Sequence, residues 1–177
     1  FKPLLPVGDS SFIRRIVSSF RAAGVSDIAV VTGHNAEALR EHLGGLGVAC
    51  LRNEDYATRD MFSSVRIGLL YIGGRCGRAF LTPVDVPVFG AAGLPPMRAL
   101  MDARGASAVL PSYRGRRGHP VLIGCGAIPG ILAYRGDMGL KGALYALGDS
   151  AITLELDDPG LVMDADEPED YRRVLRY

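Results

Sequence analysis

The chain has 177 residues, a hydrophobic fraction of 48% and a formal net charge of +1, from 20 basic and 19 acidic residues. This length suits one domain with an ample apolar core, and the balanced charge gives no sign of a nucleic-acid or membrane-surface partner. No apolar run reaches the length of a membrane span. The three cysteines are scattered and odd in number, which favours reduced thiols in a cytoplasmic protein.

Helices and strands are predicted to alternate over about the first hundred residues. Two prolines in residues 1–8 predict an extended segment or loop. An apolar stripe from Phe12 to Phe20 then predicts an amphipathic helix that ends at Gly24. Further helices are predicted over 35–43, 63–72, 94–103, 128–134 and 140–147, with a closing helix after 164–171. Strands are predicted over 28–32, 48–51, 79–84, 107–110, 119–123 and 152–156.

This alternation predicts an α/β fold with a mostly parallel central sheet and helices on both faces. The second half of the chain has shorter and less regular segments than the first. No internal repeat and no low-complexity linker divides the sequence. We therefore expect a single domain.

A carboxylate ends one of the predicted buried strands. Asp85 follows the apolar residues 79–84 and precedes Val86 and Pro87. A charge at the end of a buried strand is costly unless a partner pairs it, and ligands bind at the carboxyl ends of strands in open α/β sheets. Asp85 is therefore a candidate functional residue, and a cap of the following turn is an equal alternative.

A second carboxylate, Asp166 or its neighbour Asp164, follows the apolar run 161–163. Two carboxylates from distant segments can hold one Mg²⁺ together with substrate phosphates. Residues 166–169 also match a helix start, with Asp166 as the N-cap, Pro168 in the first turn and Glu169 at the third position. On spacing alone the cap is favoured over the metal ligand, although one carboxylate could serve both roles.

Three other polar residues are candidates on weaker patterns. His119 follows Arg116 and Arg117 and is a candidate contact for a phosphate or a pterin, with a solvated hairpin tip as the favoured alternative. Ser63 and Ser64 begin a predicted helix whose free N–H groups can bind a ligand, with ordinary capping as the favoured alternative. The sequence has no Gly-x-Ser-x-Gly elbow, Walker loop or Gly-x-Gly-x-x-Gly motif.

Five stretches, in order along the whole chain, resemble the MobA-like nucleotidyltransferases. Residues 2–8 resemble the end of the family's nucleotide-binding signature, in which a Gly-rich loop ending in Arg precedes the lysine. Residues 55–69 resemble its base-binding segment, and residues 83–87 its metal-binding Asp motif, with Val84 in place of the usual Gly. Residues 115–121 and 164–170 are similar to later motifs of the molybdenum cofactor cytidylyltransferase branch.

The resemblance implies a Rossmann-like, three-layer α/β/α nucleotidyltransferase fold over residues 1–177, with the Gly-rich loop expected upstream of Phe1. It also implies a Mg²⁺ cofactor. The implied site residues are Lys2 and Asp85 for catalysis, Lys2, Ser63, Ser64 and Asp85 for nucleotide binding, Asp85 and Asp166 for the metal, and Arg117 and His119 for the acceptor.

The implied reaction moves CMP from CTP onto the phosphate of a molybdopterin-type acceptor and releases pyrophosphate. One alternative keeps this chemistry with another phosphorylated acceptor, such as a sugar phosphate, or with GTP. An alternative of another class is a catalytically inactive nucleotide-binding scaffold that serves a molybdoenzyme maturation partner. A Gly-rich loop that is truly missing would favour the scaffold.

Overall fold

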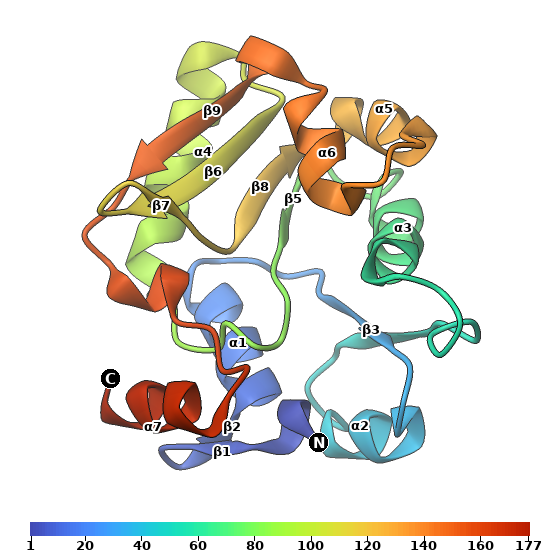
Figure 1. Ribbon diagram of the computed structural model, residues 1–177, viewed down its shortest axis with the longest axis vertical. Coiled ribbons are helices and arrows are strands. Elements are labelled where there is room, and N and C mark those ends of the chain that lie inside the picture. The colour runs from blue at the N-terminus through green and yellow to red at the C-terminus, as the bar shows by residue number, and fades with distance from the viewer.

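The computed structural model describes residues 1–177 and has helices on both sides of a central sheet (Figure 1). The helices are α1 (Phe12–Ala22), α2 (Ala36–His42), α3 (Met61–Ile72), α4 (Leu94–Arg104), α5 (Ile128–Ala133), α6 (Gly139–Tyr145) and α7 (Pro168–Arg176). The strands are β1 (Pro6–Val7), β2 (Ser10–Ser11), β3 (Ala29–Thr32), β4 (Ala49–Arg52), β5 (Arg78–Leu81), β6 (Ala108–Tyr113), β7 (Arg116–Arg117), β8 (Val121–Gly124) and β9 (Ala151–Glu155). Short 3₁₀ helices are η1 (Lys2–Leu4), η2 (Ala91–Gly93), η3 (Cys125–Ala127), η4 (Gly148–Ser150) and η5 (Pro159–Val162).

The main sheet has five strands in the order β5–β8–β6–β7, with β9 on the other side of β6. β9 is parallel to β6, whereas β8 is antiparallel to both β5 and β6. β3 and β4 form a separate parallel pair. The expected α/β fold is confirmed, but the directions in the main sheet are mixed rather than mostly parallel. The reason is the short return from β6 through β7 to β8, because a tight turn can join only antiparallel strands.

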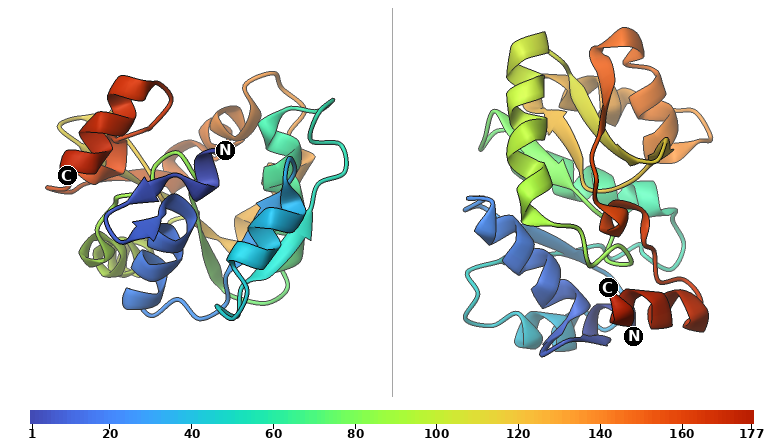
Figure 2. Two further views of the ribbon diagram at one scale, coloured as in Figure 1. Left: turned by 90° about the horizontal axis from the view of Figure 1, so that it is seen from below. Right: turned by 90° about the vertical axis from the view of Figure 1, so that its left-hand side faces the viewer.

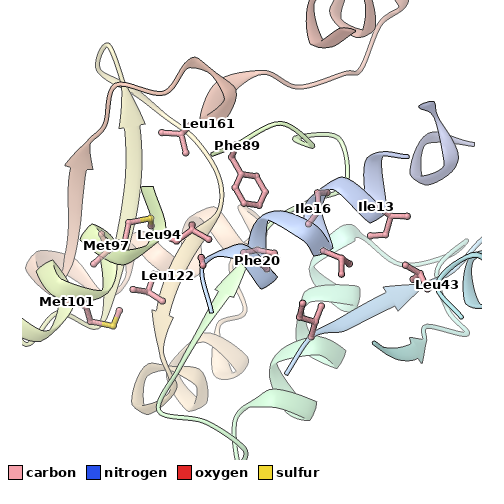
Figure 3. Packing of buried hydrophobic residues seen from close by; sticks show 14 of the residues in the cluster. Ile13, Ile16, Phe20, Leu43, Phe89, Leu94, Met97, Met101, Leu122 and Leu161 are labelled. Carbon is pink, nitrogen blue, oxygen red and sulfur yellow. The ribbon is translucent and has the colours of Figure 1, made fainter. Parts of the chain in front are cut away.

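Alternate side chains of the central strands reach two separate helical layers. Val109 of β6 and Leu122 of β8 pack with α1 and α4, in the cluster that Figure 3 shows. Their chain neighbours Ala108 and Ile123 instead pack with α3, α5 and α6. Because successive side chains of a strand point to opposite faces, the sheet is buried on both sides. The three-layer α/β/α arrangement follows directly from this alternation.

Helix α1 confirms the predicted apolar stripe. Its five buried side chains begin at Phe12 and end at Phe20, whose ring packs against Phe89 at a centroid distance of 5.2 Å. Ser11 caps the helix and accepts a hydrogen bond from the backbone N of Arg14 at 3.4 Å. Burying side chains of this kind stabilises the fold by about 1.5–3 kcal/mol each. No helix of the structure is both long and apolar enough to span a membrane.

Several boundaries differ from the sequence expectation. Residues 2–4 form a 3₁₀ turn rather than an extended segment, because Pro3 is tolerated in a first turn. β5 ends at Leu81, before Pro83, which cannot donate a ladder hydrogen bond. The apolar run after Asp158 is the 3₁₀ helix η5, and α3 begins two residues earlier than expected because Asp60 is its cap.

Gly118 packs tightly between strand β6 and the 3₁₀ helix η5. Its backbone N donates to the carbonyl oxygen of Pro111 at 2.8 Å, and a Cβ at this position would overlap the carbonyl oxygen of Leu161. By contrast, a Cβ at Gly126 would meet no atom within 4 Å. An added methyl group would therefore be crowded at Gly118 and free of contacts at Gly126, although the substitution is the same.

We predict that Gly118→Ala lowers the free energy of unfolding by about 1–3 kcal/mol, because the backbone must move to admit the methyl group. Urea denaturation followed by circular dichroism measures this change. Gly126→Ala is the matched control and should leave the midpoint nearly unchanged. Equal losses in both variants would contradict the tight packing at Gly118.

Candidate functional site

The two ends of the chain meet beside the end of β5. Lys2 Nζ donates to Asp166 Oδ1 at 2.6 Å, across 164 positions of sequence. The backbone N of Ala165 donates to the carbonyl oxygen of Asp85 at 2.9 Å, so the two carboxylate loops are joined directly. The N-terminal segment and α7 lie side by side at one end of the molecule (Figure 2). The structure therefore brings together Lys2, Asp85 and Asp166, which the sequence assigned to catalysis and metal binding.

The charges of these three side chains act on one another. Burial raises the pKa of the half-buried Asp85 carboxyl, the charge of Asp166 raises it further, and the Lys2 ammonium opposes both. The hydrogen bond to Asp166 raises the pKa of Lys2, which therefore stays protonated. The Lys2 and Asp166 side chains are 39% and 61% exposed, so their pair contributes at most about 1 kcal/mol to stability. The ion pair thus positions charge more than it stabilises the fold.

Asp166 is not the cap of α7, contrary to the favoured expectation. The cap is Glu167, whose side chain accepts from the backbone of the third helical residue. The Asp170 side chain in turn accepts from the backbone N of Glu167 at 3.0 Å. The cap falls one residue later than expected because Pro168 takes the first helical position, where its missing N–H costs nothing. The Asp166 carboxylate is thereby left to pair with Lys2.

A buried asparagine that the sequence argument missed organises the start of α3. Asn53 is 2% exposed, and its Nδ2 donates to Ser63 Oγ at 3.1 Å and to Ser64 Oγ at 2.9 Å. Its Oδ1 accepts from the backbone N of Asp55 at 3.0 Å. Ser63 and Ser64 do not cap the helix, since Asp60 does so. The available signal was the position of Asn53 directly after β4, just as Asp85 directly follows the apolar run 79–84.

His119 lies inside the fold, not at a solvated hairpin tip as favoured from the sequence. The tip is formed by Arg114 and Gly115, whose φ angles of 49° and 76° suit a two-residue turn. Burial lowers the pKa of His119, and a hydrogen bond to the Leu81 carbonyl offsets part of this effect. Its Nδ1 is buried and has no hydrogen-bond partner. A neutral imidazole with an unused polar atom is an uncommon feature that a bound ligand would explain.

Arg117 lies in different surroundings from His119, although only one residue separates them. Its side chain is exposed on β7, and its guanidinium stands 5.5 Å from the centre of the Tyr145 ring of α6. No hydrogen bond joins Arg117 or His119 to Lys2, Asp85 or Asp166. The predicted acceptor residues are therefore not hydrogen-bonded to the charged group formed by Lys2, Asp85 and Asp166.

The donor set fits a divalent cation that is shared with a substrate. No group of three or more His, Cys, Asp or Glu side chains is placed so that it could hold a metal ion alone. Asp85 and Asp166 supply hard oxygen atoms, and Mg²⁺ is commonly held by one or two carboxylates while phosphates complete its shell. The repulsion that raises the pKa of Asp85 is one that a bound cation would relieve.

Comparisons with known proteins identify the family and the fold of this chain. The family model described as MobA-like NTP transferase domain matches residues 1–151. The molybdenum cofactor cytidylyltransferase of Escherichia coli is 25% identical over 147 residues, which cover 82% of this chain and 72% of that protein. The manganese complex of Rv0371C from Mycobacterium tuberculosis matches with a TM-score of 0.82 at 23% identity, covering 99% of this chain and 92% of that one. A nucleotidyl transferase from Methanothermobacter also matches with a TM-score of 0.82, at 25% identity, covering 99% and 83%.

We predict that Asp85→Asn raises the melting temperature of the ligand-free protein at pH 7. The raised pKa means that ionised Asp85 opposes folding above that pKa, and the amide removes this cost. The gain should shrink as the pH falls toward 3.8, the ordinary aspartate value, because the wild-type carboxyl then becomes neutral. Calorimetry at several pH values measures it, with Asp157→Asn as an exposed control. A gain that is constant with pH would contradict the assignment.

We also predict that Asn53→Ala lowers the free energy of unfolding by about 1–3 kcal/mol, because it leaves buried polar groups without partners. Ser63→Ala should cost less, since Asn53 then still donates to Ser64. Urea denaturation of both variants measures the difference. Equal effects would show that Asn53 does not organise the two hydroxyl groups.

Proposed function

Because the chain belongs to the MobA-like NTP transferase family, we propose that it transfers CMP from CTP onto the phosphate of a molybdopterin-type acceptor and releases pyrophosphate. The family and the fold make the chain a nucleotidyltransferase, and the Escherichia coli relative suggests both the nucleotide and the acceptor. The observation that carries the proposal is the meeting of Lys2, Asp85 and Asp166 beside the end of β5. This is where an open α/β sheet binds its ligands.

The chemistry requires positioning and charge neutralisation. A phosphate of the acceptor attacks the α-phosphate of the nucleotide, and pyrophosphate leaves on the opposite side. The attacking oxygen is already ionised, so no general base is needed. Each favourable contact must therefore hold the reactants in line or balance the negative charge of the phosphates.

Lys2, Asp85 and Asp166 have complementary roles in this scheme. The protonated Lys2 ammonium donates to phosphate oxygens, and its link to Asp166 keeps it near them. Asp85 and Asp166 hold Mg²⁺, which when bound neutralises charge on the nucleotide phosphates. The manganese in the structure of the mycobacterial relative supports the use of a divalent cation.

The remaining site residues are proposed to select the two substrates. Ser63 and Ser64, held by Asn53, offer hydroxyl groups to the nucleotide. The unpartnered Nδ1 of His119 offers a neutral polar contact to the acceptor, and the exposed Arg117 offers a positive charge. The neutral state of His119 suits a pterin better than a phosphate, because its low pKa disfavours the cation.

The test is Mg²⁺-dependent release of pyrophosphate by the folded, full-length protein. CTP and GTP are compared with and without molybdopterin cofactor. Release that needs both CTP and the pterin supports the proposal. Release with GTP alone would change the nucleotide, and CTP binding without release would point to another acceptor. A folded protein that binds no nucleotide would overturn both the enzyme assignment and the nucleotide-binding scaffold.

We predict that Asp85→Ala lowers the rate of pyrophosphate release by roughly 100-fold or more while the protein stays folded. The rate loss follows from removing a carboxylate that holds the metal. Asp157→Ala, which removes an exposed carboxylate outside the assigned site, is the matched control. Normal turnover by folded Asp85→Ala protein would refute the metal role of Asp85.

A further inference from the structure

Two of the three cysteines, which appear scattered in the sequence, lie next to each other in the fold. The Sγ atoms of Cys76 and Cys125 are 3.3 Å apart, although 49 positions separate them in sequence. Cys76 lies in the turn between α3 and β5, and Cys125 directly follows β8. Arg78 pairs with Gly124 in the β5–β8 ladder, and the N–H of Cys125 donates to the carbonyl of Gly77 at 2.9 Å. Backbone hydrogen bonds of the sheet thus hold the two thiols together.

We propose that Cys76 and Cys125 form a redox-sensitive dithiol site, which a peroxide converts to an intramolecular disulfide. The two sulfur atoms need to approach each other by only roughly 1 Å to reach bonding distance. Both side chains are partly exposed, so an oxidant can reach them. The third cysteine, Cys50 of β4, makes no sulfur contact and has no such partner.

The surroundings assign different roles to the two sulfur atoms. Burial and the neighbouring Cys76 raise the pKa of the Cys125 thiol to about 11, so Cys125 is protonated at neutral pH. The Cys76 thiol lies 3.6 Å from the Ile72 carbonyl oxygen, in the turn after α3. The Cys125 thiolate is thus disfavoured, so the reaction is written with the first oxidation at Cys76 and the resolving step at Cys125, and the reverse order gives the same disulfide.

The reaction balances with one peroxide molecule. The Cys76 thiolate attacks one peroxide oxygen, the O–O bond breaks, and a sulfenic acid and hydroxide form. The sulfur of Cys125 then attacks the Cys76 sulfur, its proton passes to the departing hydroxyl, and water leaves as the S–S bond forms. In total the dithiol gives up two electrons and two protons, and the peroxide becomes two molecules of water. A thiol reductant reverses the change.

The disulfide would close a long segment that includes β5, α4 and β6. It would tie the end of α3 to the end of β8, while the Lys2–Asp166 pair lies near the opposite end of β5. Closing such a loop restricts the unfolded chain and raises the melting temperature, here by roughly 5–10 °C. Oxidation should therefore stabilise the fold and leave the charged site in place.

The experiment treats the reduced, folded protein with hydrogen peroxide, blocks the remaining thiols and maps the peptides by mass spectrometry. We expect a peptide that joins Cys76 to Cys125, a free Cys50, and the predicted rise in melting temperature, which dithiothreitol reverses. Cys76→Ser and Cys125→Ser should abolish the rise. Cys50→Ser is the matched control and should retain it.

Folded wild-type protein that yields only over-oxidised Cys76, or a disulfide to Cys50, would overturn the proposal. The same rise in melting temperature in Cys125→Ser would also overturn it. Peptide mapping of the wild type needs no variant, so the test holds even if a serine variant fails to fold. Its outcome does not depend on the substrate of the enzyme.

Discussion

The candidate functional site depends on a small apolar cluster that holds the two ends of the chain together. Its buried members are Val7, Phe12, Val88, Ala165 and Val174. They come from the N-terminal segment, the loop after β5 and the C-terminal segment, so no local interaction could bring them together. The hydroxyl of Tyr171 adds a hydrogen bond to the carbonyl oxygen of Pro6 at 2.8 Å. Packing at this cluster fixes where the neighbouring Lys2, Asp85 and Asp166 meet.

The charged group is arranged for a ligand more than for stability. Two carboxylates share one lysine, and Asp85 is held where burial and a like charge oppose its ionisation. Such an arrangement weakens the ligand-free fold and favours the arrival of positive charge. A cation together with anionic phosphates would satisfy both the carboxylates and Lys2. The unfavourable ionisation of Asp85 thus both lowers the stability of the ligand-free protein and favours the cation that the proposed reaction uses.

The sequence predicted those features that depend on local patterns. The apolar stripe of α1 was visible because it follows a helical period, and Asp85 was visible because it ends a short continuous apolar run. Asn53 was missed because its role is to bind the hydroxyl groups of Ser63 and Ser64, and only the folded α3 brings these within its reach. His119 was placed at a hairpin tip because its burial comes from contacts distant in sequence, such as that with Leu81. The mixed strand directions were missed for another reason, because the alternation of helices and strands outweighed the short local return from β6 through β7 to β8.

The hydrogen bonds of Asn53 also determine the direction in which each of the two serine hydroxyl groups can donate its hydrogen. Asn53 donates to both hydroxyl oxygens, so each serine must direct its own hydrogen elsewhere. Ser63 donates its hydrogen to the carbonyl oxygen of Asp60 at 2.7 Å, whereas no bond within the protein uses the hydrogen of Ser64. The Ser64 hydroxyl therefore keeps a free hydrogen-bond donor. A ligand group that accepts this hydrogen must present a lone pair, such as a carbonyl oxygen.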